Sequence, residues 1–268
     1  MVIDYHISQL RPYINWLYFY HAWGLAGKPQ AEKDRMHEDA CRMLDTFEQR
    51  YMTHAVFQLF DANSDGDDII IAGTRLPMLR QQHPSKEGDP NLCLADFIRP
   101  LSSGIKDRIG AFATTVDGTM EHDFAADDYE RMLSQTLADR LAEATAELMH
   151  LQVRRTYWGY APDEQLSMPE LLREDYQGIR PAVGYPSMPD TSVNFLLDQL
   201  IDMKQIGIRL TESGAMKPHA SVSGLMFAHP KAHYFDIGKI GDDQLRDYAR
   251  RRHLPLELAR RFLASRLR

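Results

Sequence analysis

Residues 127–155, DDYERMLSQTLADRLAEATAELMHLQVRR, form the longest regular pattern in the chain and provide the framework for the elements around it. Apolar residues recur at steps of three or four for about eight turns, which is the period of an amphipathic α-helix. Asp127 or Asp128 can cap its first turn. The apolar side consists of Tyr129, Met132, Leu133, Leu137, Leu141, Ala144, Leu148 and Leu151. The opposite side carries Arg140, Glu143, Glu147, His150 and Arg154.

Shorter elements flank this helix in mixed order. A helix is expected over residues 31–51, the SMPE sequence at 167–170 has capping-box spacing, and Gly207 can end a helix over 192–207. Two further helices are expected at the C-terminus. The β-rich runs predict strands at 54–60, 67–73, 108–116, 208–213, 219–230 and 233–240. Because no regular βαβ alternation appears, the sequence favours an α+β fold with a largely antiparallel sheet, formed as one domain over residues 1–268.

Composition excludes several classes of function. The net charge of −7 gives a nucleic-acid partner no electrostatic basis, and the basic C-terminal run is typical of an amphipathic helical pair. Cys41 and Cys93 are the only cysteines, which suggests a reducing compartment rather than a disulfide framework. No signal peptide is visible, and the apolar stretch at 14–27 is too short to span a bilayer. A cytoplasmic protein without membrane contact is expected.

The familiar catalytic and metal motifs are missing. DANSDGDDIIIA at 61–72 opens like a calcium-binding EF-hand loop, but Ala72 stands where the bidentate glutamate is required, so a polar turn between strands is favoured. The histidines show no metal-ligand spacing, and no dinucleotide or phosphate-binding glycine pattern occurs. We therefore expect neither a metal site nor a set of catalytic residues.

The loop GIRPAVGYPSMPD, residues 178–190, is the strongest candidate for a ligand site. Three prolines and two glycines exclude regular secondary structure and make the backbone stiff. Arg180 offers a planar fork that fits a carboxylate, and Tyr185 together with Tyr234–Phe235 offers apolar walls. Glu143 and Glu174 favour a cation. Carboxylate, cation and purine together describe S-adenosylmethionine, and the alternative is a purely structural corner.

The chain as a whole resembles a known family. The blocks that carry the resemblance are colinear and include LRPYINWLYFYHAWGLAGK, IGAFATT, EDYQGIRPAVGYPSMPD and LTESGAMKPHASVSGLMFAHPKAHYFDIGKI. They are similar to the activation domain of cobalamin-dependent methionine synthase over nearly the full length. This resemblance implies a C-shaped single domain with a bent, largely antiparallel sheet flanked by helices.

The resemblance also implies a binding groove for S-adenosylmethionine. The RxxxGY signature of the family falls on Arg180, Gly184 and Tyr185. The other positions that the family implies for this groove are Ala182, Tyr234, Phe235, Glu143, Glu174 and the residue that is Asn15 here. Asn15 stands where the family usually has an aspartate for the α-ammonium, so it can still accept a hydrogen bond but brings no charge.

The implied role is repair of methionine synthase whose cobalamin has been oxidised to the cob(II) state. A flavodoxin-type protein supplies one electron, S-adenosylmethionine supplies the methyl group, and the cobalamin belongs to a partner domain or subunit. The chain is then a component of a methyltransferase, with no complete activity of its own and no catalytic residue. Its contribution is positioning.

Further points stay open at this stage. The segment PDTSVN departs from the family pattern, and it and Asn15 suit an alternative in which a ligand-free interaction protein docks on a cobalamin-binding domain. The matching region begins at Leu10, so the chain is either an excised fragment or a separately encoded subunit that meets its partner in trans. The polar side of the long helix, including Asp139 and Glu143, is either a docking face or simply solvated.

Overall fold

The computed structural model describes residues 1–268, and a six-stranded antiparallel sheet lies at its centre. The strand order is β4-β3-β2-β5-β8, and β1 pairs with the first part of β2. The register pairs Thr53 with Val116 at one end of β2 and β5, and Ala62 with Asp107 at the other. The strands are β1 (Val2–His6), β2 (Met52–Asp65), β3 (Asp68–Ile71), β4 (Thr74–Pro77), β5 (Asp107–Val116) and β8 (Ser221–Met226). A separate hairpin consists of β6 (Arg209–Leu210) and β7 (Met216–Lys217).

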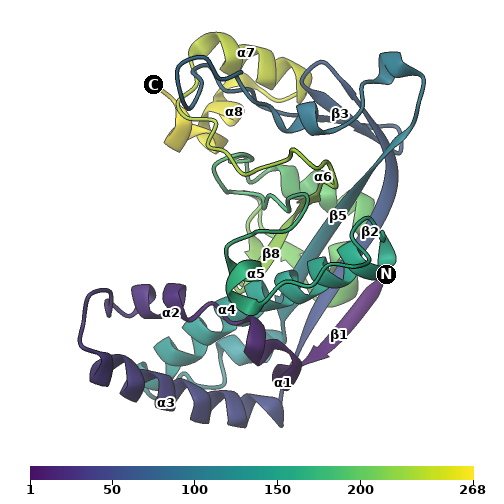
Figure 1. Ribbon diagram of the computed structural model, residues 1–268. Coiled ribbons are helices and arrows are strands. Elements are labelled where there is room, and N and C mark those ends of the chain that lie inside the picture. Colours follow the sequence, from purple (N-terminus) through teal and green to yellow (C-terminus); the bar gives the residue numbers. More distant parts are fainter.

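Helices flank the sheet at both ends of a C-shaped molecule, as Figure 1 shows. The α2 and α3 helices lie at one end, α7 and α8 lie at the other, and the long strands β2 and β5 run between them. The helices are α1 (Ile7–Leu10), α2 (Trp16–Ala22), α3 (Gln30–Glu48), α4 (Asp128–Gln152), α5 (Met168–Leu172), α6 (Val193–Ile201), α7 (Asp242–Arg251) and α8 (Leu256–Phe262). The predicted α+β class with a largely antiparallel sheet is confirmed.

The sheet separates two hydrophobic cores, because successive side chains of a strand point to opposite faces. On β5, Ala111 and Ala113 belong to the core that also contains residues of α6, α7 and α8. Phe112 between them belongs to the core shared with α1, α3 and α4. Thus β5 contributes to both halves of the molecule, and the position of each half is fixed relative to the same sheet.

The long helix α4 begins as the sequence predicts and ends in an unexpected way. The Asp127 side chain accepts a hydrogen bond from the backbone N–H of Glu130 at 2.9 Å, which caps the first turn. After Gln152 the helix widens into a π-helical turn, η5 (Val153–Tyr157), in which the N–H of Trp158 donates to the carbonyl of Val153 at 2.9 Å. Such turns are rare, and they are often found near functional sites.

Two sequence expectations are wrong in the last third of the chain. Residues 233–240 form no strand: they run irregularly, and only Ile240 makes an isolated bridge, to Leu267. Their alternation arises because Phe235 and Ile237 are buried without a neighbouring strand. The helix expected over 192–207 is interrupted at Asp202, whose φ of 47° is left-handed, and a 3₁₀ turn follows before Gly207.

Other local expectations are confirmed. Ser167 and Glu170 form the capping box that opens α5, with the Ser167 N–H and a Glu170 carboxylate oxygen 2.7 Å apart. The DANSDGDD stretch lies at the β2–β3 hairpin, which is the polar turn between strands that the sequence favours. The short edge strands β1 and β4 are not among the strands expected from the sequence. None of the helices combines the length and the hydrophobicity that a membrane span requires.

Candidate ligand-binding site

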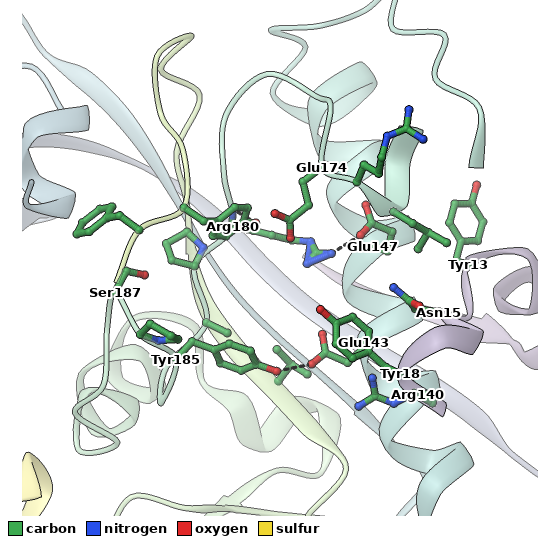
Figure 2. A pocket seen from close by; sticks show the side chains of 18 of the residues that line it. Tyr13, Asn15, Tyr18, Arg140, Glu143, Glu147, Glu174, Arg180, Tyr185 and Ser187 are labelled. Atoms are coloured by element: carbon green, nitrogen blue, oxygen red, sulfur yellow. Dashed lines mark hydrogen bonds and ion pairs between the residues drawn. The ribbon is translucent and has the colours of Figure 1, made fainter. Parts of the chain in front are cut away.

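A cavity of about 670 Å³ opens between two walls of different construction (Figure 2). We call Arg180–Ser187 with Tyr234–Asp236 the loop wall. We call Tyr13–Tyr18 with the α4 residues Arg140, Glu143 and Glu147 the helix wall. Eight of the nine residues predicted for the site line this cavity: Asn15, Glu143, Glu174, Arg180, Ala182, Tyr185, Tyr234 and Phe235. The ninth, Gly184, does not.

The loop wall is held against the free edge of β8 by its backbone. The N–H of Val183 donates to the carbonyl of Ser223 at 2.9 Å, and the N–H of Leu225 donates to the carbonyl of Pro181 at 3.1 Å. The chains lie so close at this point that a Cβ on Gly224 would be 2.2 Å from the Pro181 carbonyl oxygen. Since no side chain fits there, glycine is what allows the loop to lie on the sheet edge.

Gly184 shapes the loop rather than lining the cavity. Its φ of +90° is a conformation that other residues adopt only with strain, and its N–H donates to the carbonyl of Met188 at 2.8 Å. The resulting turn presents the half-exposed ring of Tyr185 to the cavity. The Tyr185 hydroxyl donates across the cavity to Glu143 at 2.8 Å, so this bond connects the two walls (Figure 2).

Arg180 also spans the two walls, through an ion pair with Glu147 on α4. Both side chains are buried, and Oε1 of Glu147 and Nε of Arg180 have no hydrogen-bond partner. Burial opposes the charge of Arg180, but Glu147, Tyr176, Tyr234 and Glu143 together outweigh it, and the guanidinium pKa is raised well above its usual value. The guanidinium therefore carries its charge inside the protein, and its Nη1, which bonds to no other group of the chain, is left for a further acceptor.

The burial of α4 corrects the sequence interpretation of its polar side. Glu147, His150 and Arg154 were placed on the side facing away from the core, and all three are buried. Glu143 lies one turn before Glu147 and is only partly buried. In the sequence, the spacing of these two glutamates is the signal that they face the same way, because residues four apart share one helix face. Only the position of Arg180 shows which of them becomes an ion-pair partner.

Glu174 lies at the end of the cavity where the helix wall and the loop wall approach each other (Figure 2). Its backbone has a φ of 63°, a strained conformation for a residue with a Cβ. Burial raises the pKa of its carboxyl group, the positive charge of Arg180 opposes this shift, and Glu147 and Glu143 add to it. A cation placed beside Glu174 would favour its ionised form.

Asn15 caps helix α2 at the edge of the cavity. Its Oδ1 accepts a hydrogen bond from the Leu17 N–H at 3.2 Å. The side-chain amide nitrogen is then left to face the cavity, as Figure 2 shows. Tyr18, which the sequence analysis did not single out, lies beside it with its ring 5.9 Å from the Arg140 guanidinium carbon. Asn15 therefore presents a donor to the cavity rather than the acceptor expected from the sequence.

The charges around the cavity suit a ligand that carries both signs. Four acidic side chains and three arginines line it: Glu143, Glu147, Glu174, Asp236, Arg140, Arg173 and Arg180. The aromatic rings of Tyr13, Tyr18, Tyr185, Tyr234 and Phe235 supply flat apolar surface. Neither cysteine nor histidine lines it, and no group of side chains in the chain is arranged to hold a metal ion. The charged and aromatic groups of the cavity can bind and orient such a ligand.

The segment PDTSVN stays outside the cavity. Asp190 is buried, accepts the Tyr248 hydroxyl at 2.7 Å and also accepts the Ser192 N–H at 2.8 Å. Asn194 is buried as well and donates to the Gly214 carbonyl at 2.8 Å. The departure of this segment from the family pattern therefore affects packing between the loop and α7, and leaves the lining of the cavity intact.

An α+β domain that holds a mixed-charge cavity between a helix and a Pro/Gly loop is a ligand-binding module. Residues 6–253 match the family model described as "Vitamin B12 dependent methionine synthase, activation domain", and the chain belongs to this family. It is also similar to the crystal structure of the MetH reactivation domain bound to AdoHcy, with 42% sequence identity and a TM-score of 0.94. That match covers 100% of this chain and 90% of the other.

Proposed function

We propose that the cavity binds S-adenosylmethionine and that the chain supports reductive methylation of cob(II)alamin in cobalamin-dependent methionine synthase. One observation carries the proposal: a single cavity collects eight of the nine residues that the family resemblance implies for the ligand. The reactivation domain to which the chain is similar binds AdoHcy, which is S-adenosylmethionine without its transferable methyl group.

Each part of the ligand finds a matching group in the cavity. The Nη1 group of Arg180, which has no partner within the chain, suits the carboxylate. Glu143 and Glu174 suit the positive sulfonium and ammonium groups. Tyr185, Tyr234 and Phe235, with the backbone around Ala182, offer the flat surface that a purine needs. Gly184 contributes by shaping the turn before Tyr185.

The residues of this chain act by positioning. Reduced cobalamin, carried by the partner, supplies the nucleophile that accepts the methyl group. The stiff loop wall and the buried Arg180–Glu147 pair hold the ligand's charged end, so its methyl group keeps one direction relative to the open side of the cavity. Fixing two reactants in this way can lower a barrier by several kcal/mol, on the order of 7–11 in the best cases. No acid, base or covalent step is assigned to the chain.

Membership of the family implies a cobalamin-binding domain as the partner. We extend the proposal to a flavodoxin-type electron donor, to a cytoplasmic location, and to the absence of nucleic-acid and membrane partners. The net charge of −7 supports the exclusion of nucleic acid. We also propose that residues 1–268 form one domain, because β5 contributes side chains to both cores.

The Arg180–Glu147 pair favours one alternative, a ligand-free interaction protein that docks on a cobalamin-binding domain. In that case the pair is a permanent structural contact, and Arg180 never meets a carboxylate. Asn15, with no charge for an ammonium group, fits the same alternative. The polar side of α4 around Asp139, whose side chain is 40% exposed, is the surface that would dock.

A reconstitution experiment separates the two functions. The purified chain is mixed with methionine synthase that lacks its own activation domain and carries cob(II)alamin, together with a flavoprotein reductant and S-adenosylmethionine. We expect the absorption spectrum of methylcobalamin to appear only when the chain is present, and Arg180→Ala to abolish its appearance. If the chain binds the partner in ultracentrifugation but methylation does not depend on it, the interaction protein is the correct function.

A further inference from the structure

A buried polar network lies directly behind the loop wall and outside the cavity. Its members are Arg154, Glu164, His150 and Tyr176, and none of them lines the cavity. Arg154 and His150 have 0% exposed surface and Tyr176 has 8%. Polar groups are costly to bury unless they are fully hydrogen-bonded, so a cluster of this kind needs a reason for being there.

Arg154 is the anchor of this network. Its Nε and Nη2 donate to the two carboxylate oxygens of Glu164 at 2.8 and 2.7 Å, and its Nη1 donates to Nδ1 of His150 at 2.8 Å. Burial and the positive charges of Arg154 and Arg180 hold the pKa of His150 well below its usual value, so this ring is a neutral acceptor. All three nitrogens of the guanidinium are engaged, which fixes its plane.

The π-helical turn η5 is what makes this position possible. Arg154 belongs to that turn, and its carbonyl accepts the N–H of Ala161 at 3.0 Å as the chain folds back toward Glu164. The wider turn changes the direction in which the side chain leaves the helix axis. The network is therefore set by a backbone irregularity, and is not a by-product of regular α-helix packing.

Arg154 and His150 together fix the ring of Tyr176. The guanidinium carbon of Arg154 lies 3.9 Å from the centre of that ring, and the His150 ring meets it edge-on at 5.1 Å. The Tyr176 hydroxyl is 3.4 Å from the Tyr234 hydroxyl. The Tyr234 oxygen also accepts the backbone N–H of Arg180 at 3.0 Å. A continuous path of contacts thus leads from Glu164 to the backbone of the residue that reaches into the cavity.

We propose that Tyr176, held by Arg154, is a positioning residue for the ligand site: it fixes the Tyr234 hydroxyl and through it the backbone of Arg180. Arg180 is then held twice, at its guanidinium by Glu147 and at its N–H by Tyr234. This inference rests on the proposed function, since it describes how the same cavity is kept ready for S-adenosylmethionine. It assigns a role to residues that never touch the ligand.

The test is Tyr176→Phe, which removes one hydroxyl and keeps the ring between Arg154 and His150. Tyr248→Phe is the matched control, because Tyr248 is 2% exposed and its hydroxyl bonds to Asp190 away from the cavity. Both variants lose one buried hydroxyl contact and should have lower Tm values. By calorimetric titration, Tyr176→Phe should bind S-adenosylmethionine about fivefold more weakly, and Tyr248→Phe should bind it like the wild type.

Two further readouts distinguish positioning from general destabilisation. Tyr234→Phe removes the group through which Tyr176 is proposed to act, so adding Tyr176→Phe to it should weaken binding no further. Amide hydrogen exchange at Arg180 should be faster in Tyr176→Phe and unchanged in Tyr248→Phe. Arg154 is unsuitable as the main test site, because removing it leaves Glu164 unpaired in the interior and endangers folding.

The possible failures are separate. If the wild type does not bind S-adenosylmethionine, the proposed function is wrong and this inference with it. If the wild type binds but Tyr176→Phe binds equally well, or no more weakly than Tyr248→Phe, the positioning role alone is wrong. Additive losses in the Tyr176→Phe, Tyr234→Phe double variant would likewise overturn the path through Tyr234.

Discussion

The two walls of the cavity differ in what holds them in place. The loop wall is positioned by backbone: prolines restrict its dihedral angles, and main-chain hydrogen bonds attach it to the edge of β8. The charged groups of the helix wall are positioned by side-chain contacts, because Glu143 and Glu147 on α4 take their partners from the opposite wall. The shape of the loop wall therefore follows from its local sequence, whereas the contacts of the helix wall depend on residues far along the chain.

The two walls therefore contribute to ligand binding in different ways. The loop wall offers a shape that exists before any ligand arrives, which reduces the entropic cost of binding. The helix wall offers charged side chains that bind partners on the opposite wall. Changes to the helix wall should therefore act through electrostatics, and changes to the loop wall through geometry.

The largest effect is expected when the buried charge pair is broken. Glu147→Gln leaves the Arg180 guanidinium charged and without its counter-charge in the interior, which should lower the free energy of unfolding by about 3–5 kcal/mol. Glu143→Gln, one turn earlier on the same helix and partly exposed, should cost less than about 1 kcal/mol. Urea unfolding of both variants checks this, and equal losses would show that α4 does not discriminate between its two glutamates.

A smaller loss in the free energy of unfolding is expected when a new side chain pushes the loop away from the end of β8. Gly178→Ala introduces a Cβ at a φ of +85° and 2.2 Å from the Phe227 carbonyl oxygen. Left-handed strain of about 1–2 kcal/mol and overpacking of about 1–3 kcal/mol should add, and the displaced loop should bind S-adenosylmethionine more weakly.

Gly207→Ala is the control, because its φ of +83° imposes the same strain with no atom within 4 Å of the new Cβ. In thermal unfolding, Gly207→Ala should lose only the stability that the left-handed strain costs. Its affinity for S-adenosylmethionine should be unchanged. A Gly178→Ala variant that behaves like Gly207→Ala would mean that the contact with Phe227 yields easily.

A gain of affinity is expected from restoring a charge on the helix wall. Asn15→Asp keeps the cap on α2, since aspartate is an equally good N-cap, and adds a carboxylate at the cavity edge. A charge-assisted hydrogen bond is roughly twice as strong as a neutral one, so S-adenosylmethionine should bind about fivefold more tightly. Methylthioadenosine, which has no α-ammonium group, should show no gain; a gain with both ligands would place the charge elsewhere on the ligand.

The smallest expected effect is a pH dependence of S-adenosylmethionine affinity that arises from Glu174. Burial raises its pKa in the folded protein, so its contribution to stability is lost as the pH rises from the ordinary to the raised value. A cation bound beside it would lower that pKa and release a proton. S-adenosylmethionine affinity should therefore increase with pH across this window.

Calorimetric titrations in two buffers of different ionisation enthalpy measure the released proton. The Glu174→Gln variant should show neither the proton release nor the pH dependence below neutral pH. Proton release that persists in this variant would assign the titration to another acid.

Much of this molecule could be predicted from its sequence, and the reasons differ between elements. The sequence predicts helix α4, with Asp127 or Asp128 as its cap, because its period extends over many turns. It predicts the 178–190 loop because proline and glycine act locally. Six of the eight lining residues are candidates from the chemistry of the loop and its neighbours. Ala182 and Asn15 come from the family resemblance, which carries information about distant contacts that no local pattern contains.

The failures share one physical cause. Burial of Glu147, His150 and Arg154 depends on partners that lie 10 or more residues further along the chain, so the helix period alone could not reveal it. Residues 233–240 alternate like a strand, but no neighbouring strand is available to pair with them. The donor role of Asn15 depends on its Oδ1 being used by α2, which only the three-dimensional structure shows.

S-adenosylmethionine is expected to bind between the two walls. Calorimetric titration of the purified chain with this ligand measures that binding directly. We expect saturable binding with one site per chain in the wild type, and loss of binding in Arg180→Ala, with Arg131→Ala on the exposed start of α4 as a control that binds normally. Absence of binding at millimolar ligand in the wild type, or equal binding in Arg180→Ala, would contradict the account.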